Sequence, residues 1–264
     1  MVEAEHAQSE RMRASVPPDD HWQDYAHMFR MDPYRSEDAL LNRLREEISP
    51  RHTVVDVGAG GGRLALPLAL QCQQVVAVEP SPSMASVLLQ QAAEYGINNV
   101  SLIQARWEDA EVAPADAALC VHVLYTIQDI GPFVRKLEAH AREKVLIVLY
   151  KTAPQSQIYP LWQKVHEEER LPLPGLPQLE KVLKELGIDA QVEMLSPPPL
   201  RGFDSLEQAT EELSRRLYLP PGSAKKARLM EMLPEQLEQV EGVFRIRDAQ
   251  PLEPALVWWR PNLA

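Results

Sequence analysis

The feature that most constrains this chain is the stretch Thr53-Val54-Val55-Asp56-Val57-Gly58-Ala59-Gly60-Gly61-Gly62-Arg63, which an apolar run follows at once. The valines are β-branched and nearly continuous, which is typical of a short strand buried on both faces of a parallel sheet. The glycines that come next end the strand and leave backbone amides uncovered by side chains. A following helix would point its positive end at those amides, so the stretch predicts a cradle for a polar ligand.

Two kinds of cofactor compete for this cradle. The dinucleotide fingerprint G-x-G-x-x-G/A can be placed on Gly60, Gly62 and Ala65, but the tight turn would then come well after the strand has ended. If the fingerprint starts at Gly58, it requires a glycine where the chain has Arg63, and it fails. A nicotinamide-dependent oxidoreductase therefore stays open only through the late placement.

The spacing Asp56, Gly58, Gly60, Gly62 matches D-x-G-x-G-x-G and resembles motif I of the class I S-adenosylmethionine-dependent methyltransferases, of the methyltransferase type 11 kind. The resemblance implies an α/β fold of the Rossmann-like class. Its sheet would be seven-stranded and mostly parallel, with strand order 3-2-1-4-5-7-6. The cofactor would be S-adenosyl-L-methionine, with Asp56, Gly58, Ala59, Gly60 and Gly62 holding its methionine and ribose end.

The second predicted strand, Gln74 onward, ends in an acid, Glu79, followed by Pro80. An acid at this place in a Rossmann-like site can accept hydrogen bonds from both ribose hydroxyls. At the end of the third strand the family often carries an acid that contacts adenine, but Ala105 or Arg106 stands there. Trp107 is the alternative adenine contact, by stacking, and the competing interpretation is that it anchors the core.

The fourth strand, with the loop beyond it, spans 116–125 and resembles the family's strand beside the methyl group. Val121 and His122 would line the sulfonium, and His122 and Tyr125 are the candidate catalytic residues beside the acceptor. His122 has an unperturbed pKa near neutrality, which suits a general base. The alternative is that it is a hydrogen-bonding residue of the wall.

The composition disfavours some partners. A formal net charge of −11 argues against a nucleic-acid acceptor, since such affinity comes mostly from phosphate neutralisation by Lys and Arg. Cys72 and Cys120 are expected to be buried free thiols in a reducing cytoplasm. The acidic segment 1–10 is not expected to be a secretory signal, and no apolar run approaches the roughly 20 residues of a membrane span. The seven histidines show no metal-ligand spacing, so no metal is expected.

The N-terminal 50 residues are expected to be accessory to the core. Residues 1–20 are polar and carry Pro17-Pro18, which predicts disorder. Trp22, Tyr25 and Phe29 follow at helical spacing, so 21–30 is predicted to be a short helix with an aromatic stripe. This stripe is either a lid in which Trp22 and Tyr25 meet the ligands, with Tyr25 against the sulfonium, or simple packing on the core.

The remaining chain divides at proline-rich boundaries into a core at 51–200, a helical insertion at 201–242 and a final hairpin at 243–264. Local signals predict helix starts at Ser36, Ser81, Asp204, Ser223 and Pro234, a helix at 61–72 kinked by Pro67, and pairing of 243–247 with 255–259. Arg215, Arg216, Lys225, Lys226 and Arg228 make the insertion basic. That charge indicates a solvated face or attraction of an acidic substrate.

The expected function is methyl transfer from S-adenosylmethionine to a small molecule through an O, N or C nucleophile. A sulfonium methyl is already activated, so positioning in a dry pocket is the main requirement. The alternative is a cofactor-binding protein without methyl transfer. The sequence indicates neither the acceptor nor the oligomeric state.

Overall fold

The computed structural model describes residues 1–13, 19–198 and 202–262. The fold centres on a seven-stranded sheet with the order β3-β2-β1-β4-β5-β9-β6. Its strands are β1 (Thr53–Val57), β2 (Gln74–Val78), β3 (Val100–Ile103), β4 (Ala115–Val121), β5 (Ala141–Tyr150), β6 (Gln191–Met194) and β9 (Pro254–Trp259). β1 to β5 pair in parallel, and β9 lies antiparallel between β5 and β6. The sheet order expected from the resemblance, 3-2-1-4-5-7-6, is confirmed, with β9 in the place of strand seven.

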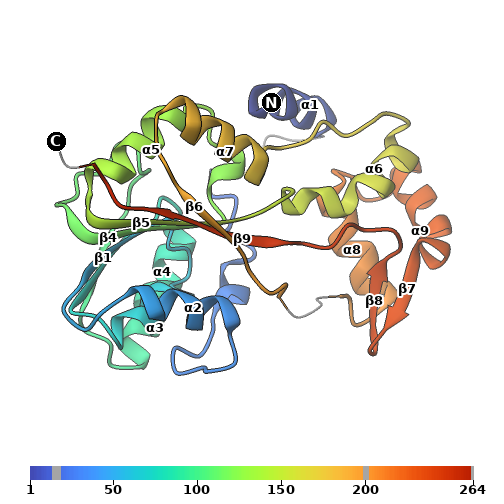
Figure 1. Cartoon of the computed structure of the whole chain (residues 1–264). Coiled ribbons are helices and arrows are strands. Elements are labelled where there is room, and N and C mark those ends of the chain that lie inside the picture. The colour runs from blue at the N-terminus through green and yellow to red at the C-terminus, as the bar shows by residue number, and fades with distance from the viewer. Residues whose placement is uncertain (14–18, 199–201, 263–264) are drawn as a thin grey trace.

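Helices cover both faces of this sheet (Figure 1). α5 and α7 lie on one face, and α2, α3 and α4 on the other. The helices are α1 (Val2–Met12), α2 (Ala39–Glu47), α3 (Ala65–Ala69), α4 (Pro82–Glu94), α5 (Ile130–Ala139), α6 (Tyr159–His166), α7 (Leu176–Glu185), α8 (Leu206–Arg216) and α9 (Ala224–Gln236), with 3-10 turns η1 (Ala26–Phe29), η2 (Leu124–Thr126) and η3 (Pro154–Ile158). Two apolar clusters, one on each face, hold the layers together. β1 contributes to both, which is why its valines run almost without interruption.

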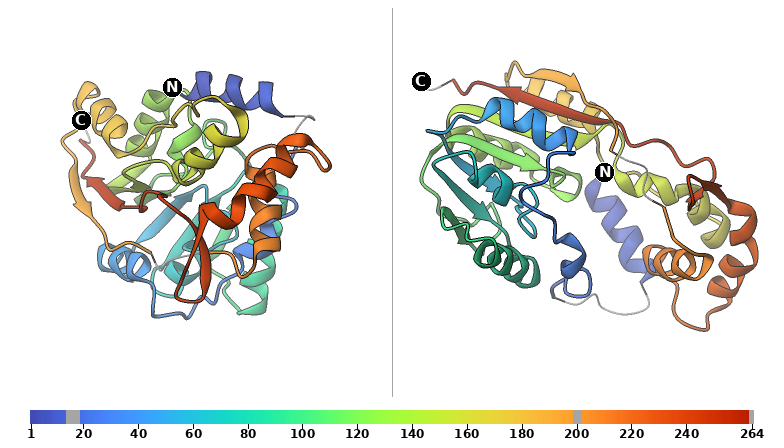
Figure 2. Two further views of the ribbon diagram at one scale, coloured as in Figure 1. Left: turned by 90° about the vertical axis from the view of Figure 1, so that its right-hand side faces the viewer. Right: turned by 90° about the horizontal axis from the view of Figure 1, so that it is seen from below.

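α6, α8 and α9 pack around a third apolar cluster beside the sheet, together with the hairpin β7 (Leu237–Val240) and β8 (Val243–Ile246). Figure 1 shows this unit to the right of the sheet, and Figure 2 shows α1 between it and the core. The predicted pairing of 243–247 with 255–259 is wrong, because β8 pairs with β7. Glu241 and Gly242 both have positive φ, 52° and 88°, which is the turn geometry that closes a tight hairpin.

The predicted capping residues are of the right type, but at several helices the cap lies at a neighbouring position. Asp38, not Ser36, caps α2, and Ser205, not Asp204, caps α8; each side chain accepts from a backbone N–H of the first turn. Ser81 caps α4 as predicted, with Pro82 at its first position. Pro234 does not open a helix but lies inside the last turn of α9. The carbonyl that it leaves unbonded belongs to Met230, which is exposed and can meet water.

The helix predicted at 61–72 is only the five-residue α3. Gly60 and Gly62 adopt positive φ, so the turn after β1 extends further than expected. Pro67 then falls in the first turn of α3, where N–H groups have no partner within the helix. Leu66 and Leu68 donate to the carbonyls four positions back, while the Arg63 carbonyl, which Pro67 cannot reach with an N–H, accepts from Arg35 instead.

The N-terminal predictions also differ from the structure. Where 1–20 was expected to be disordered, α1 docks through polar side chains: Arg170, whose side chain is 4% exposed, pairs with Glu5 and donates to Ser9 and Gln8. Pro17-Pro18 lie outside the described residues. The segment 21–30 is a series of turns followed by η1, not a continuous helix.

Candidate functional site

The glycine turn leaves β1 with three left-handed residues, Gly58, Gly60 and Gly62, at φ of 74°, 56° and 87°. A Cβ on Gly58 would lie 2.3 Å from Cγ2 of Val123, and one on Gly62 would lie 2.9 Å from Leu66. A Cβ on Gly60 would meet nothing within 4 Å. Gly58 and Gly62 are thus required by close packing, while Gly60 presents an open side on which a ligand can lie.

Glu79 lies under this open side. Its Oε2 accepts from the backbone N–H of Gly60 at 2.8 Å and its Oε1 from that of Ser81 at 2.9 Å. Burial raises the pKa of Glu79, while the amides of Ser81 and Gly60 oppose that rise. Each carboxylate oxygen keeps a second lone pair, so the group is held in place and can still accept from two vicinal hydroxyls.

Asp56 is 2% exposed, and its carboxyl group forms no hydrogen bond to another described residue. Burial, followed by the nearby negative charge of Glu79, raises the pKa of Asp56 to about 7. The carboxyl group is therefore poised to ionise when a cation arrives.

His122, Tyr125 and Tyr150 form one aromatic cluster where β4 and β5 end. The His122 ring stacks on Tyr150 with centroids 4.3 Å apart, and its Nδ1 lies 3.0 Å from the Tyr125 hydroxyl. Burial, and then the charge of Arg63, lower the pKa of His122 to about 4. This low pKa argues against the general-base role suggested by the unperturbed value.

The adenine side differs from the prediction at Trp107. Its ring is 3% exposed and packs against Phe133 and His140, and Nε1 donates to the Phe133 carbonyl. Trp107 is therefore a core residue and offers no face for stacking. Pro80 and Arg106 are exposed beside the ends of β2 and β3, and Val121 is half-buried at the end of β4.

The segment at 19–29 contacts both the glycine turn and the start of α4. Asp20 accepts from Ser81 Oγ and from the backbone N–H of Ser83, and, although burial opposes it, hydrogen bonds from Ser83 and Ser81 lower the pKa of Asp20 to about 2. A Cβ on Gly61 would lie 3.2 Å from Cβ of Phe29 and 3.3 Å from its carbonyl oxygen, so the backbone of Phe29 approaches the turn closely. Trp22 packs edge-on against Phe29 and is 39% exposed.

Tyr25 does not face the glycine turn but lies under the Arg215 guanidinium of α8, 4.9 Å from its ring. It thus connects the N-terminal segment to the insertion. Sequence reasoning did not assign Asp20, Arg63, Val123 or Tyr150 to the site. Only Arg63 carried a local signal, since it directly follows the glycines.

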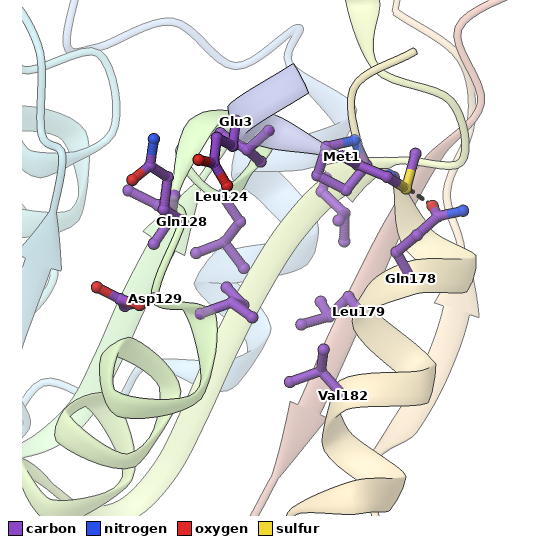
Figure 3. A pocket seen from close by; sticks show the side chains of 14 residues that line it. Met1, Glu3, Leu124, Gln128, Asp129, Gln178, Leu179 and Val182 are labelled. Atoms are coloured by element: carbon purple, nitrogen blue, oxygen red, sulfur yellow. Dashed lines mark hydrogen bonds between the residues drawn. The ribbon is translucent and has the colours of Figure 1, made fainter. Parts of the chain in front are cut away.

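A cavity of about 390 Å³ lies on the α5–α7 side of the sheet, next to the loop that carries His122. Leu124, Leu149, Leu179 and Val182 are among its apolar lining residues, and Met1 and Glu3 from the start of the chain also line it (Figure 3). None of its lining residues belongs to the glycine turn, so this space is separate from the cradle.

The described residues include no group of three or more His, Cys, Asp and Glu side chains placed to hold a metal ion. Over the same ranges, no helix is long and apolar enough to cross a lipid bilayer.

The residues present fit an adenosyl sulfonium compound. Gly60 supplies the open side, Glu79 faces it with free lone pairs, and Asp56 and Glu79 are acids beside the turn. The adenine would lie near Pro80 and Arg106, without the tryptophan stack.

Comparisons with known proteins agree with this geometry. Residues 54–144 match the methyltransferase domain family. A ribosomal RNA small subunit methyltransferase A from Thermotoga petrophila is 32% identical over 124 residues, 45% of each chain. A ubiquinone biosynthesis O-methyltransferase from Rickettsia felis is 24% identical over 129 residues, 48% of this chain and 52% of the relative.

The solved structures extend the likeness beyond the matched region. Magnesium protoporphyrin IX methyltransferase from Synechocystis PCC 6803, solved with bound S-adenosylhomocysteine, covers 74% of this chain and 89% of its own, with a TM-score of 0.51 and 17% identity. The chain spans about half or less of the length of the curated relatives it matches. Residues 54–144 are therefore similar to the methyltransferase domain, and the chain shares its fold with solved methyltransferase structures.

Proposed function

We propose that this chain binds S-adenosylmethionine at the glycine turn and transfers its methyl group to a small organic acceptor. The observation that carries the proposal is Glu79, fixed by two backbone amides beneath the open side of Gly60. A carboxylate held this way is prepared for the ribose hydroxyls before the ligand arrives, so binding requires little reordering.

The cofactor supplies an activated methyl group, and the chain supplies position. Glu79 would hold the ribose, and the acidic side of the turn near Asp56 would favour the cationic end of the cofactor. The aromatic cluster where β4 and β5 end would exclude water. Neither Glu79, which is bonded to two amides, nor His122, whose pKa is low, is a strong base at neutral pH. This arrangement favours an acceptor that ionises readily.

A small-molecule acceptor is favoured over RNA, although some relatives are named for ribosomal RNA. The net charge is −11, and a nucleic-acid surface requires clustered Lys and Arg to neutralise phosphates. Transfer of labelled methyl from S-adenosylmethionine into a small-metabolite extract, but not into total RNA, is the expected result. Label in RNA alone would overturn the choice of acceptor.

The cofactor assignment is tested by calorimetry with S-adenosylhomocysteine. Glu79→Gln should weaken binding by about 1.5–3 kcal/mol, roughly 10- to 100-fold, because a charged acceptor for the ribose hydroxyls is lost. Glu180→Gln, an exposed carboxylate on α7, is the control and should bind normally.

Gly60→Ala is a second probe with its own control. Its Cβ would project into the open side and should abolish binding of S-adenosylhomocysteine. Gly96→Ala has a similar φ of 66° and equally open surroundings at the end of α4, and it should leave binding intact. Wild-type affinity in both Glu79→Gln and Gly60→Ala would refute the assignment of the site.

A further inference from the structure

His122 is held in a backbone conformation that a histidine rarely adopts. Its φ is +59°, in the left-handed region that favours glycine. Its N–H donates to Val148 O at 2.8 Å, and the next side chain, Val123, packs on Gly58. The peptide is therefore fixed on both sides, against β5 and against the glycine turn. Strain of this kind in a residue with a side chain points to a use for that side chain.

The hydrogen bonds of Tyr125 determine which nitrogen of His122 carries the proton. The Tyr125 hydroxyl oxygen accepts from the backbone N–H of Tyr150 at 2.7 Å and lies 3.0 Å from His122 Nδ1. Tyr125 is 4% exposed, so its O–H needs an acceptor within the protein, and Nδ1 is in place. Nδ1 accepts that proton, and the neutral ring therefore carries its own hydrogen on Nε2.

Nε2 is the ring's remaining polar atom. It forms no hydrogen bond to any residue within 1–13, 19–198 or 202–262. One face of the ring is covered by Tyr150, so a ligand can meet His122 only at its edge. The positive charge of Arg63, which follows the glycines, acts on the same ring. A donor N–H beside a guanidinium is complementary to an anionic oxygen.

We propose that His122, through Nε2–H, donates a hydrogen bond to the carboxylate at the amino-acid end of the bound cofactor, and that Tyr125 is the positioning residue that holds this tautomer. The inference rests on the proposed binding of S-adenosylmethionine. His122 would then bind the cofactor and would not remove a proton from the acceptor, because the lone pair of Nδ1 already accepts from Tyr125.

The tautomer is tested first on the ligand-free protein. Long-range ¹H–¹⁵N correlation spectra at pH 7 should show His122 neutral, with its proton on Nε2. Tyr125→Phe removes the hydroxyl and should produce a mixture of tautomers. A protonated Nδ1 or a charged ring in the wild-type protein at pH 7 would overturn the inference.

The carboxylate is tested by comparing S-adenosylhomocysteine with 5′-methylthioadenosine, which lacks the amino-acid end. His122→Ala should weaken S-adenosylhomocysteine by about 10-fold, as expected for one charge-assisted hydrogen bond, and leave methylthioadenosine within about 2-fold. His122→Gln, whose amide can replace Nε2–H, should recover part of the loss. His52→Gln, which lies just before β1 at the opposite end of the strands, is the control.

The outcomes separate the two proposals. An unchanged ratio of the two affinities in His122→Ala overturns the role of His122 and leaves cofactor binding standing. A wild-type protein that binds neither compound overturns both.

Discussion

Gly58→Ala offers a direct test of why the turn after β1 contains glycine. The new Cβ would lie 2.3 Å from Val123 Cγ2, far inside the 3.5–4.0 Å at which carbon atoms attract each other. The positive φ of 74° adds roughly 1–2 kcal/mol for a residue with a side chain, and overpacking adds about 1–3 kcal/mol. The substitution should therefore lower the free energy of unfolding by about 2–5 kcal/mol.

Urea unfolding measures this change, and a double-mutant cycle divides it. Gly96→Ala has a φ of 66° and nothing within 4 Å, so it should show the backbone cost alone. Val123→Ala in the Gly58→Ala background should recover the overpacking part, about 1–3 kcal/mol, after the single Val123→Ala effect is subtracted. If Gly58→Ala costs no more than Gly96→Ala, or if Val123→Ala recovers nothing, the close approach of β4 to the turn is not what requires glycine.

Two other predictions concern buried charges. The pKa of Asp56 is raised in the folded state to about 7, so the folded protein binds more protons than the unfolded chain above pH 4, and stability should fall as pH rises from about 4 to 7. Asp56→Asn should flatten this part of the stability curve, and an equal slope in the variant would contradict the assignment. Arg170→Met should release α1, since Glu5 would be left charged and buried at a cost of about 3–5 kcal/mol. Hydrogen exchange at 2–12 should rise, Glu5→Gln in the same chain should reduce the effect, and continued protection of α1 would refute the role of Arg170.

The sheet was predictable because its signals are local. The β-branched runs of β1 and β5, the cap at Ser81 and the stop at Gly96 each act within a few residues. Cap positions were displaced where two candidates compete within three residues, as Ser36 and Asp38 do, because tertiary contacts decide between them. Asp38 prevails because its carboxylate also lies 3.9 Å from the guanidinium of Arg63 in the glycine turn.

The failures depend on partners far away in sequence. α1 is polar and lacks an apolar stripe, and it is ordered by Arg170, some 160 positions later. The indole of Trp107 lies in the core, where its Nε1 donates a hydrogen bond to the Phe133 carbonyl. The aromatic spacing predicted a helix at 21–30, but residues 21–25 form turns, and the preceding Asp20 bonds to Ser81 and Ser83 at the start of α4. A single sequence carries no information about such pairings.

The charges around the glycine turn bear on the choice between the two cofactors that the sequence left open. Asp20 and Glu79 lie close enough for the charge of one to raise the pKa of the other, and Glu79 does the same to Asp56. A dinucleotide would add the negative charges of its pyrophosphate to this group of carboxylates and increase their mutual repulsion. A sulfonium compound brings positive charge and relieves it, and it favours the ionised form of Asp56. The mutual repulsion of these carboxylates therefore favours a cationic ligand, in agreement with the methyltransferase domain that residues 54–144 match.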